Sequence, residues 1–287
     1  MLSHATPQTI HATESEPGTG TAGRPGGTLH ARRVMLVVQA FTLLPGADHG
    51  PSELAAATGL NAAVVYRILQ SGISTATFLR SPAGRYRLGP GAALTGMQAM
   101  ATAPDARVRP VLEHLSRTVD GFALLWVLSP YGGPGKSYAA SAPGRYDFES
   151  LGLGITDLIE VGNSLRVGAS GRVIAAYLPP LLISNLLEWP LPAGAGPGTA
   201  PTAAEFTASL AEARESGYAV AREEIPGWTE IAAPVLWGDA VYGAVSVIKP
   251  SSLMPDDLSL PVAATTAAAE RLALSAPGES DPCAIAG

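Results

Sequence analysis

The feature that most constrains this chain is the order of short elements that residues 32–88 predict. Residues 32–44 carry apolar side chains at helical spacing and are followed by a Pro-Gly pair. Ser52 is placed to cap a short helix over residues 53–58, and Gly59 is placed to end it. These patterns predict two helices in close succession.

A third helix begins near Asn61 with the string AAVVYRILQ, and two extended pieces follow at 77–80 and 85–88. Between these pieces lie a Pro and a Gly, which are typical turn residues of a hairpin. Helix, helix, turn, helix and hairpin in this order predict a winged helix-turn-helix, whose last helix enters the major groove of DNA.

The third helix has an inward stripe of Val65, Ile68 and Leu69, so its other face is expected to meet DNA. There Arg67 suits guanine, a glutamine suits adenine, and the tyrosine hydroxyl suits a phosphate. Arginines of the hairpin suit the backbone or the minor groove. The candidate DNA-binding residues are Asn61, Ala62, Ala63, Tyr66, Arg67, Gln70, Arg80, Arg85 and Arg87.

The charge distribution is consistent with a polyanion that binds only the N-terminal region of the chain. Residues 28–96 carry six arginines against two acidic residues, whereas residues 97–287 carry 11 basic and 20 acidic residues. A basic module on an acidic body favours nucleic-acid contact through the module alone. Chance clustering in an arginine-biased sequence is the alternative explanation.

The second region mixes strand and helix patterns, which predicts an α+β domain with a largely antiparallel sheet. The spacing Thr202 to Glu205 is that of a capping box, and Gly217 is placed to end the helix that it starts. Expected helices cover 106–119, 173–178, 202–217 and 261–274, and expected strands cover 121–128, 136–141, 231–236 and 241–248.

Four strings in order resemble the IclR family of bacterial transcriptional regulators: SELAAATGLNAAVVYRIL, GRYRLG, GASGRVIAAYLP and SGYAVAREEIPGWTEIAAPVLWGDAVYGAVSV. The resemblance as a whole covers roughly residues 30–275. The resemblance implies a homodimer or tetramer that binds a double-stranded DNA operator, with a GAF-like C-terminal domain that binds a small organic effector. In GASGRVIAAYLP, Arg172 stands where the family has lysine.

Four positions depart from the family's pattern around the third helix. Ala63 and Val64 stand where polar residues are usual, Gly72 where a core leucine is expected, and Ala76 where a glycine turns the chain into the hairpin. Because glycine disfavours a helix interior by about 1 kcal/mol, the third helix is expected either to end early at Gly72 or to fray there.

An effector site is expected at the turn before the helix at 173–178, where free backbone N–H groups suit a carboxylate. The resemblance adds the strand that carries Ser246 and the acidic segment 221–230, where Ala221 stands in place of a possible aspartate. Carboxylates there suit an amine or a hydroxyl-bearing ligand, provided they face a cavity. The candidate effector-binding residues are Ala169, Ser170, Gly171, Glu224, Glu230 and Ser246.

The residues near this expected effector site also have explanations that involve no ligand. Glutamates such as Glu223 and Glu224 are more often solvated surface charges than ligands. Trp126, Tyr138 and Trp228 are equally well explained as core aromatics and as pocket walls. The sequence therefore leaves the walls of a pocket open.

Enzymatic chemistry finds little support. The five histidines are dispersed, the chain has a single cysteine, and phosphate-loop and dinucleotide fingerprints are missing, so we expect no catalytic residues, no metal and no cofactor. No apolar run is long enough to span a membrane and no secretory signal is evident, so a cytoplasmic protein is expected.

The resulting hypothesis is an effector-responsive regulator, and the alternative is a ligand-sensing or protein-interaction module whose helix-turn-helix no longer reads DNA. The expected domains are a disordered tail (1–27), the winged helix-turn-helix (28–90), a helical linker (91–104), the effector domain (105–275) and a flexible tail (276–287).

Overall fold

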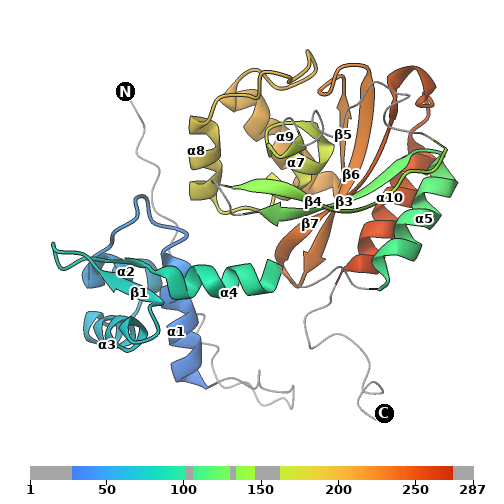
Figure 1. Cartoon of the computed structure of the whole chain (residues 1–287). Helices are drawn as coiled ribbons and strands as arrows, with labels where there is room; N and C mark the ends of the chain where they lie inside the picture. The colour runs from blue at the N-terminus through green and yellow to red at the C-terminus, as the bar shows by residue number, and fades with distance from the viewer. Residues whose placement is uncertain (1–27, 101–105, 130–133, 146–161, 274–287) are drawn as a thin grey trace, which may run out of the picture. The chain divides into compact units, whose positions relative to one another are not determined.

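The structure is a computed structural model that describes residues 28–100, 106–129, 134–145 and 162–273 (Figure 1). Contacts within the chain divide it into two compact units. Residues 28–100 form the first unit, and the second holds most of the described residues from 106 onward. None of the helices in these described ranges has the length and apolar character needed to cross a membrane.

The first unit is a winged helix-turn-helix followed by one more helix. β1 and β2 form an antiparallel hairpin in which Leu79 pairs with Arg87. The elements in order are α1 (Leu29–Ala40), α2 (Pro51–Thr58), α3 (Ala62–Ile73), β1 (Phe78–Arg80), β2 (Tyr86–Leu88) and α4 (Pro90–Met100). The predicted order of helices and hairpin is confirmed.

Apolar side chains from α1, α2, α3 and both strands form one core in this unit. The predicted inward stripe of α3 is confirmed, because Val65, Ile68 and Leu69 are all buried. The rings of Phe78 and Tyr86, which are 2% and 1% exposed, anchor the hairpin to that stripe. The core therefore fixes the orientation of α3 with its opposite face exposed.

Two helix starts differ from their predictions. α1 begins at Leu29 because the Thr28 hydroxyl accepts a hydrogen bond from Ala31 N–H. α2 begins at Pro51 with Gly50 as its N-cap, so Ser52 lies inside the helix and does not cap it. Proline is well suited to the first helical position because its missing N–H has no partner there.

The expectation that α3 ends early at Gly72 is wrong, because the helix continues to Ile73. The Phe78 ring packs directly against the glycine, and a Cβ at this position would overlap the ring. The glycine thus makes room for a hairpin residue in place of a leucine side chain. Ala76 adopts a left-handed backbone with φ of 53°, the conformation that a glycine takes most readily.

The second unit is a five-stranded sheet covered by helices on both faces. The strand order is β4-β3-β7-β6-β5, and every neighbouring pair is antiparallel, as predicted. The elements are α5 (Val108–Val119), β3 (Phe122–Ser129), β4 (Gly135–Ala142), α7 (Gly168–Ala175), α8 (Pro180–Glu188), α9 (Ala203–Ser216), β5 (Ala219–Arg222), β6 (Trp228–Trp237), β7 (Ala240–Pro250) and α10 (Ser259–Leu272).

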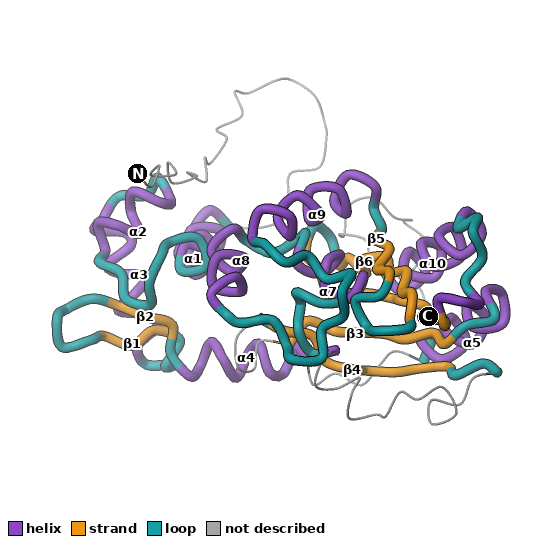
Figure 2. Tube along the Cα trace, turned by 90° about the horizontal axis from the view of Figure 1, so that it is seen from above, coloured by secondary structure: helices purple, strands orange, loops and turns teal. Residues whose placement is uncertain are grey.

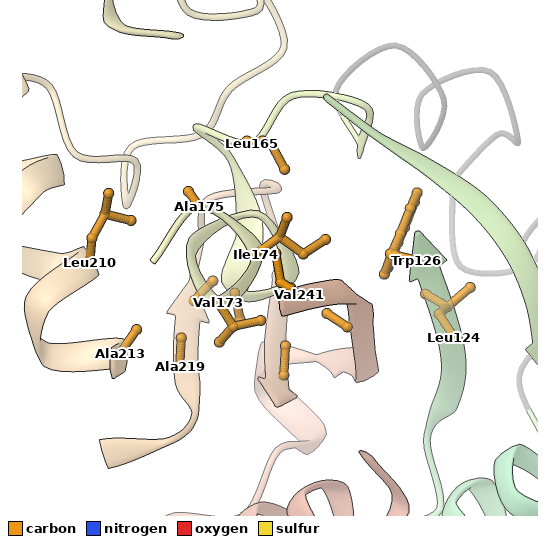
Figure 3. Close-up of a cluster of buried hydrophobic side chains, with 14 of the residues drawn as sticks. Leu124, Trp126, Leu165, Val173, Ile174, Ala175, Leu210, Ala213, Ala219 and Val241 are labelled. Carbon is orange, nitrogen blue, oxygen red and sulfur yellow. The ribbon is translucent and has the colours of Figure 1, made fainter. Parts of the chain in front are cut away.

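Each face of this sheet has its own hydrophobic core. α5 and α10 lie together on one face, and α7 with α9 behind it lies on the other (Figure 2). Figure 3 shows Val173 and Ile174 of α7 gathered with Leu124 and Trp126 of β3 and with Leu210 of α9. The α+β fold class, with a mixed α/β C-terminal domain, is confirmed.

Several boundaries of the second unit depend on local hydrogen bonds. The predicted capping box is confirmed, since Thr202 and Glu205 exchange hydrogen bonds and Gly217 ends α9 with φ of 77°. α7 begins at Gly168 rather than after it, so residues 169–171 form its first turn and not a loop before it. β5 and α8 were not predicted, and residue 274 of the expected last helix lies outside the described residues.

Exchanging Gly72 for alanine tests the packing of Phe78. Gly72→Ala is expected to lower the free energy of unfolding of the first unit by about 1–3 kcal/mol, because the added Cβ overlaps a buried ring. Gly96→Ala in α4 adds a Cβ in open space and is expected to stabilise by up to about 1 kcal/mol. Amide hydrogen exchange in α3 is measured on the full chain in both variants. Helix propensity alone predicts stabilisation in both variants, whereas the packing of Phe78 predicts destabilisation by Gly72→Ala only.

Candidate functional sites

The exposed face of α3 carries most of the predicted DNA-binding residues. Asn61, Ala62, Ala63, Tyr66 and Arg67 are all exposed, whereas the core side of the helix is buried. The Asn61 side chain accepts a hydrogen bond from Ala63 N–H at 2.8 Å and so caps the helix. The N-terminal half of α3 therefore presents a small apolar surface that is bounded by Tyr66 and Arg67.

Two predicted arginines have no internal partner. Within the part of the chain that the structure describes, the side chains of Arg67 on α3 and Arg80 on β1 make no hydrogen bond or ion pair. Arg67 lines a groove of about 500 Å³ between α1, α3 and β1, together with Arg33. These side chains are accordingly available to an external anion.

The other two hairpin arginines are engaged within the unit. Arg87 makes a bidentate ion pair with Asp48, at 2.7 and 2.6 Å. Arg85 donates to the Asp48 carbonyl and to the Glu53 carboxylate at 2.6 Å. The hydrogen bond from Arg87 lowers the pKa of Asp48, and the hydrogen bond from Gly50 N–H, helped by Arg85, lowers the pKa of Glu53. Arg85 and Arg87 therefore brace the hairpin against the segment before α2.

Gln70 also has an internal role that its predicted outward orientation did not include. Its side-chain amide donates to the Tyr86 hydroxyl at 2.6 Å, which ties α3 to β2. Tyr86 and His49 exchange backbone hydrogen bonds at 2.7 and 2.9 Å, so the segment before α2 lies alongside β2. Gln70 thus helps to hold the hairpin and is only partly exposed.

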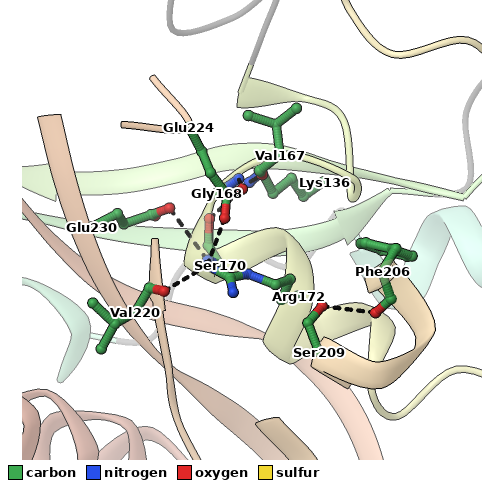
Figure 4. A network of polar contacts seen from close by, with 10 residues as sticks. All are labelled: Lys136, Val167, Gly168, Ser170, Arg172, Phe206, Ser209, Val220, Glu224 and Glu230. Atoms are coloured by element: carbon green, nitrogen blue, oxygen red, sulfur yellow. Dashed lines mark hydrogen bonds and ion pairs between the residues drawn. The ribbon is translucent and has the colours of Figure 1, made fainter. Parts of the chain in front are cut away.

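The first turn of α7 binds two carboxylates of the protein itself (Figure 4). Gly168 N–H donates to Glu224 Oε2 at 2.7 Å, and Ser170 N–H donates to Glu230 Oε2 at 3.3 Å. Glu224 and Glu230 are only 4% and 5% exposed. Gly168 has φ of 84°, and a Cβ there would overlap the Glu230 carboxylate. The backbone donors of this turn are therefore already bound to two carboxylates of the chain itself.

Lys136 on β4 supplies a buried cation to the same place. Its ammonium donates to the Val167 carbonyl and to Ser170 Oγ, both at 2.8 Å, and lies 5.1 Å from the centre of the Trp126 ring. Burial lowers the pKa of Lys136 to about 8, although Glu230 and Glu224 favour its charged form. This lysine was not among the predicted site residues.

Arg172 completes the network on the other side of Glu224. Its guanidinium forms an ion pair with Glu224 Oε1 at 2.6 Å and donates to the Val220 carbonyl. Burial raises the pKa of Glu224, against the lowering effect of Arg172 and of Gly168 N–H. Two cations and two carboxylates therefore neutralise one another within the fold, which is how buried charges are tolerated.

The remaining predicted effector residues lie close to this network or within its core. Ala169 and Gly171 are buried in the same helical turn. Ser246 is fully buried, and its hydroxyl accepts from Trp126 Nε1 at 3.2 Å. The side chains leave a space of about 160 Å³ that is too narrow for a water molecule and is lined by Gly168, Ala221, Glu224, Ile225, Trp228, Glu230 and Ile248.

The alternatives left open by the sequence are resolved residue by residue. Glu223 lies at a surface turn, where it accepts from Gly227 N–H, whereas Glu224 is buried, so only Glu223 fits a surface charge. Trp126 and Trp228 belong to the core, and Trp228 also borders the narrow space. Tyr138 is 54% exposed and forms no wall of it.

Comparison with known proteins identifies a family domain in the second unit. Residues 157–273 match the family described as "Bacterial transcriptional regulator IclR C-terminal". The second unit of the chain therefore carries a match to the C-terminal domain of IclR regulators. A comparison with curated proteins found no match.

Several solved structures share the fold of this chain. An IclR-family protein from Rhodococcus sp. is 20% identical, with 90% of this chain and 96% of that chain covered and a TM-score of 0.52. A transcriptional regulator from Rhodococcus sp. RHA1 is 22% identical over 86% of this chain and 96% of its own, with a TM-score of 0.50. The Thermotoga maritima IclR is 16% identical over 84% and 96%, with a TM-score of 0.50.

One feature of the sequence could have identified Lys136, the site residue that was not predicted. The chain has only two lysines, Lys136 and Lys249, in an otherwise arginine-based set of cations, and both are buried. Exposed lysines are common on protein surfaces, so a chain that keeps lysine only at buried positions points to places where a compact ammonium is needed. Among the described residues, no group of His, Cys, Asp or Glu side chains is arranged to hold a metal ion.

The depressed pKa of Lys136 predicts a pH dependence of stability. Between about pH 8 and 10.5 the unfolded chain keeps a proton that the folded chain has released, so the free energy of unfolding rises with pH. Relative to Lys136→Met, the wild type is expected to gain about 3 kcal/mol across this window. Urea unfolding of both proteins at several pH values measures the difference, and parallel pH profiles would contradict it.

Proposed function

We propose that this protein is a transcription regulator that binds double-stranded DNA through α3 and the hairpin, and whose C-terminal domain responds to a small organic effector. The observation that carries the DNA claim is the pair of exposed arginines, Arg67 on α3 and Arg80 on β1, that have no partner among the described residues. In this proposal the protein acts in the cytoplasm and is not an enzyme.

The chemistry of α3 suits the major groove of DNA. The Arg67 guanidinium can donate two parallel hydrogen bonds to a guanine edge, and Tyr66 can donate to a phosphate. Ala62 and Ala63 suit a thymine methyl group. Arg80 extends the contact to the backbone, while Arg85 and Arg87 hold the hairpin in place through Asp48 and Glu53. Sequence reading is therefore assigned mainly to Arg67.

Removing the Arg67 side chain tests this assignment. Arg67→Ala is expected to weaken binding to the cognate operator by about 1–3 kcal/mol and to relax specificity at one base pair. Arg109→Ala is the matched control, because Arg109 is an exposed arginine of α5 whose side chain pairs with Glu113 four residues on. The affinities of each variant for operator DNA and for random DNA are measured at one salt concentration. If Arg67→Ala changes neither affinity, Arg67 does not read a base pair.

Exposed apolar side chains of the first unit support self-association as a homodimer or tetramer. Leu29 and Met35 of α1 and Leu94 and Met97 of α4 are each more than half exposed, which is costly on an isolated surface. A two-fold dimer would place two α3 helices on half-sites about one DNA turn apart. Sedimentation of the full chain and the spacing of operator half-sites test this part.

The buried network indicates which effectors suit the C-terminal domain. Among the described residues, the Glu230 carboxylate accepts a single hydrogen bond, at 3.3 Å, although it is almost fully buried and borders the narrow space beside Trp228. An under-satisfied buried carboxylate favours a ligand that donates hydrogen bonds or carries positive charge. We therefore assign the effector to the amines or hydroxyl-bearing compounds.

A ligand screen that is independent of DNA tests the effector class. Small amines and polyols are expected to raise the melting temperature of the wild type, and Glu230→Gln is expected to reduce the effect of amines at least tenfold in apparent affinity. Glu223→Gln is the control, since Glu223 lies at a surface turn. If amines and polyols have no effect on the wild type, the proposed class is wrong.

The second candidate function is a ligand-sensing or interaction module that has lost sequence reading. Ala62, Ala63 and Val64 favour it, because they give the start of α3 an apolar surface. Genome-wide footprinting at low salt separates the two, since a module of this kind enriches no sites.

A further inference from the structure

The first turn of α7 is surrounded by the groups that proteins use to hold a free carboxylate. The N–H groups of Gly168 and Ser170 point outward from the helix, and the hydroxyl of Ser170, the ammonium of Lys136 and the guanidinium of Arg172 lie around them. Backbone donors at a helix start together with cations form a strong site for an anion. Every one of these donors faces buried protein.

The anions that occupy this place are delivered by the chain. Glu224 follows β5 and Glu230 lies on β6, and both carboxylates converge on the turn from the same end of the sheet (Figure 4). Glu224 uses one oxygen for Gly168 N–H and the other for Arg172. Two carboxylates balance two cations, and the remaining space does not admit a water molecule. No donor or unbalanced positive charge of this network is left for a free anion.

We propose that Glu224 and Glu230 are built-in ligands that take the place of a free small acid on α7, and that they exclude carboxylic acids as effectors of this protein. This inference rests on the proposed role of the second unit as an effector domain, and it adds which ligands that domain rejects and which residues reject them.

The chemistry of one substitution makes the proposal testable. Glu230→Ala removes a CH₂–COO⁻ group, which is the skeleton of acetate, and it leaves Ser170 N–H and the Lys136 ammonium without their carboxylate. Added acetate can then occupy the vacated volume and restore the lost hydrogen bond and charge. Glu230→Gln keeps the volume filled and offers no such vacancy.

The experiment compares sodium acetate with sodium chloride at equal ionic strength, using the full-length protein and thermal unfolding. The Glu230→Ala variant is expected to melt lower than the wild type in chloride and to regain stability as acetate increases, because a ligand of the folded state raises its stability by mass action. The wild type, Glu230→Gln and the surface control Glu223→Ala are expected to respond equally to both salts.

Each outcome decides the proposal. It is overturned if acetate does not selectively stabilise Glu230→Ala, or if it stabilises the wild type to the same extent. If Glu230→Ala does not fold in either salt, Glu224→Ala, which vacates Gly168 N–H and Arg172, decides by the same comparison. Because this readout needs no DNA and no amine, its failure leaves operator binding and the amine effector class untouched, and their failure leaves acetate rescue intact.

Discussion

The second unit is organised around four charged side chains, of which three are buried and the fourth, that of Arg172, is 16% exposed. Burying an ion is costly unless an opposite charge and hydrogen bonds compensate it, so Lys136, Arg172, Glu224 and Glu230 constrain everything near them. β4 must present the lysine, β6 must present one glutamate, and the turn after β5 must present the other. The close approach of a carboxylate to the α7 backbone in turn requires glycine at position 168. Secondary structure, sheet register and small residues in this region all follow from that balance.

The first unit depends on a different contact, which is the docking of its hairpin. Tyr86 is buried and joins three segments: its backbone bonds to His49, its hydroxyl accepts from Gln70, and its ring enters the core. Arg85 and Arg87 add ion pairs at the surface, where each contributes little by itself. The hairpin is thereby fixed relative to α3, and the side chains of Arg67 and Arg80 are exposed on this unit.

The two sites differ in how far the sequence could predict them. On α3, helical periodicity separated inward from outward residues correctly for Val65, Ile68 and Leu69, and left Arg67 exposed. Periodicity could not show that Gln70 bonds to Tyr86, because that partner lies 16 residues away across a turn. In the second unit, the N-terminal turn of α7 and its two glutamates were identified, but the lysine that neutralises them was not. Its strand, β4, lies at the far edge of the sheet from β5, and no local pattern relates the two.

The features that could be predicted from the sequence alone depend on residues that are close together along the chain. Helix spacing, the capping box at Thr202, the left-handed turns at Gly59 and Gly217 and the family motifs all act over a few positions, so they can be read along the chain. Only the tertiary structure decided that the helix start at 168–171 already carries its anions. Hydrogen bonds from Gly168 to Glu224 and from Ser170 to Glu230 join residues 56 and 60 positions apart. Such pairings depend on how strands and helices pack, because packing determines which charged groups are buried together and therefore pair.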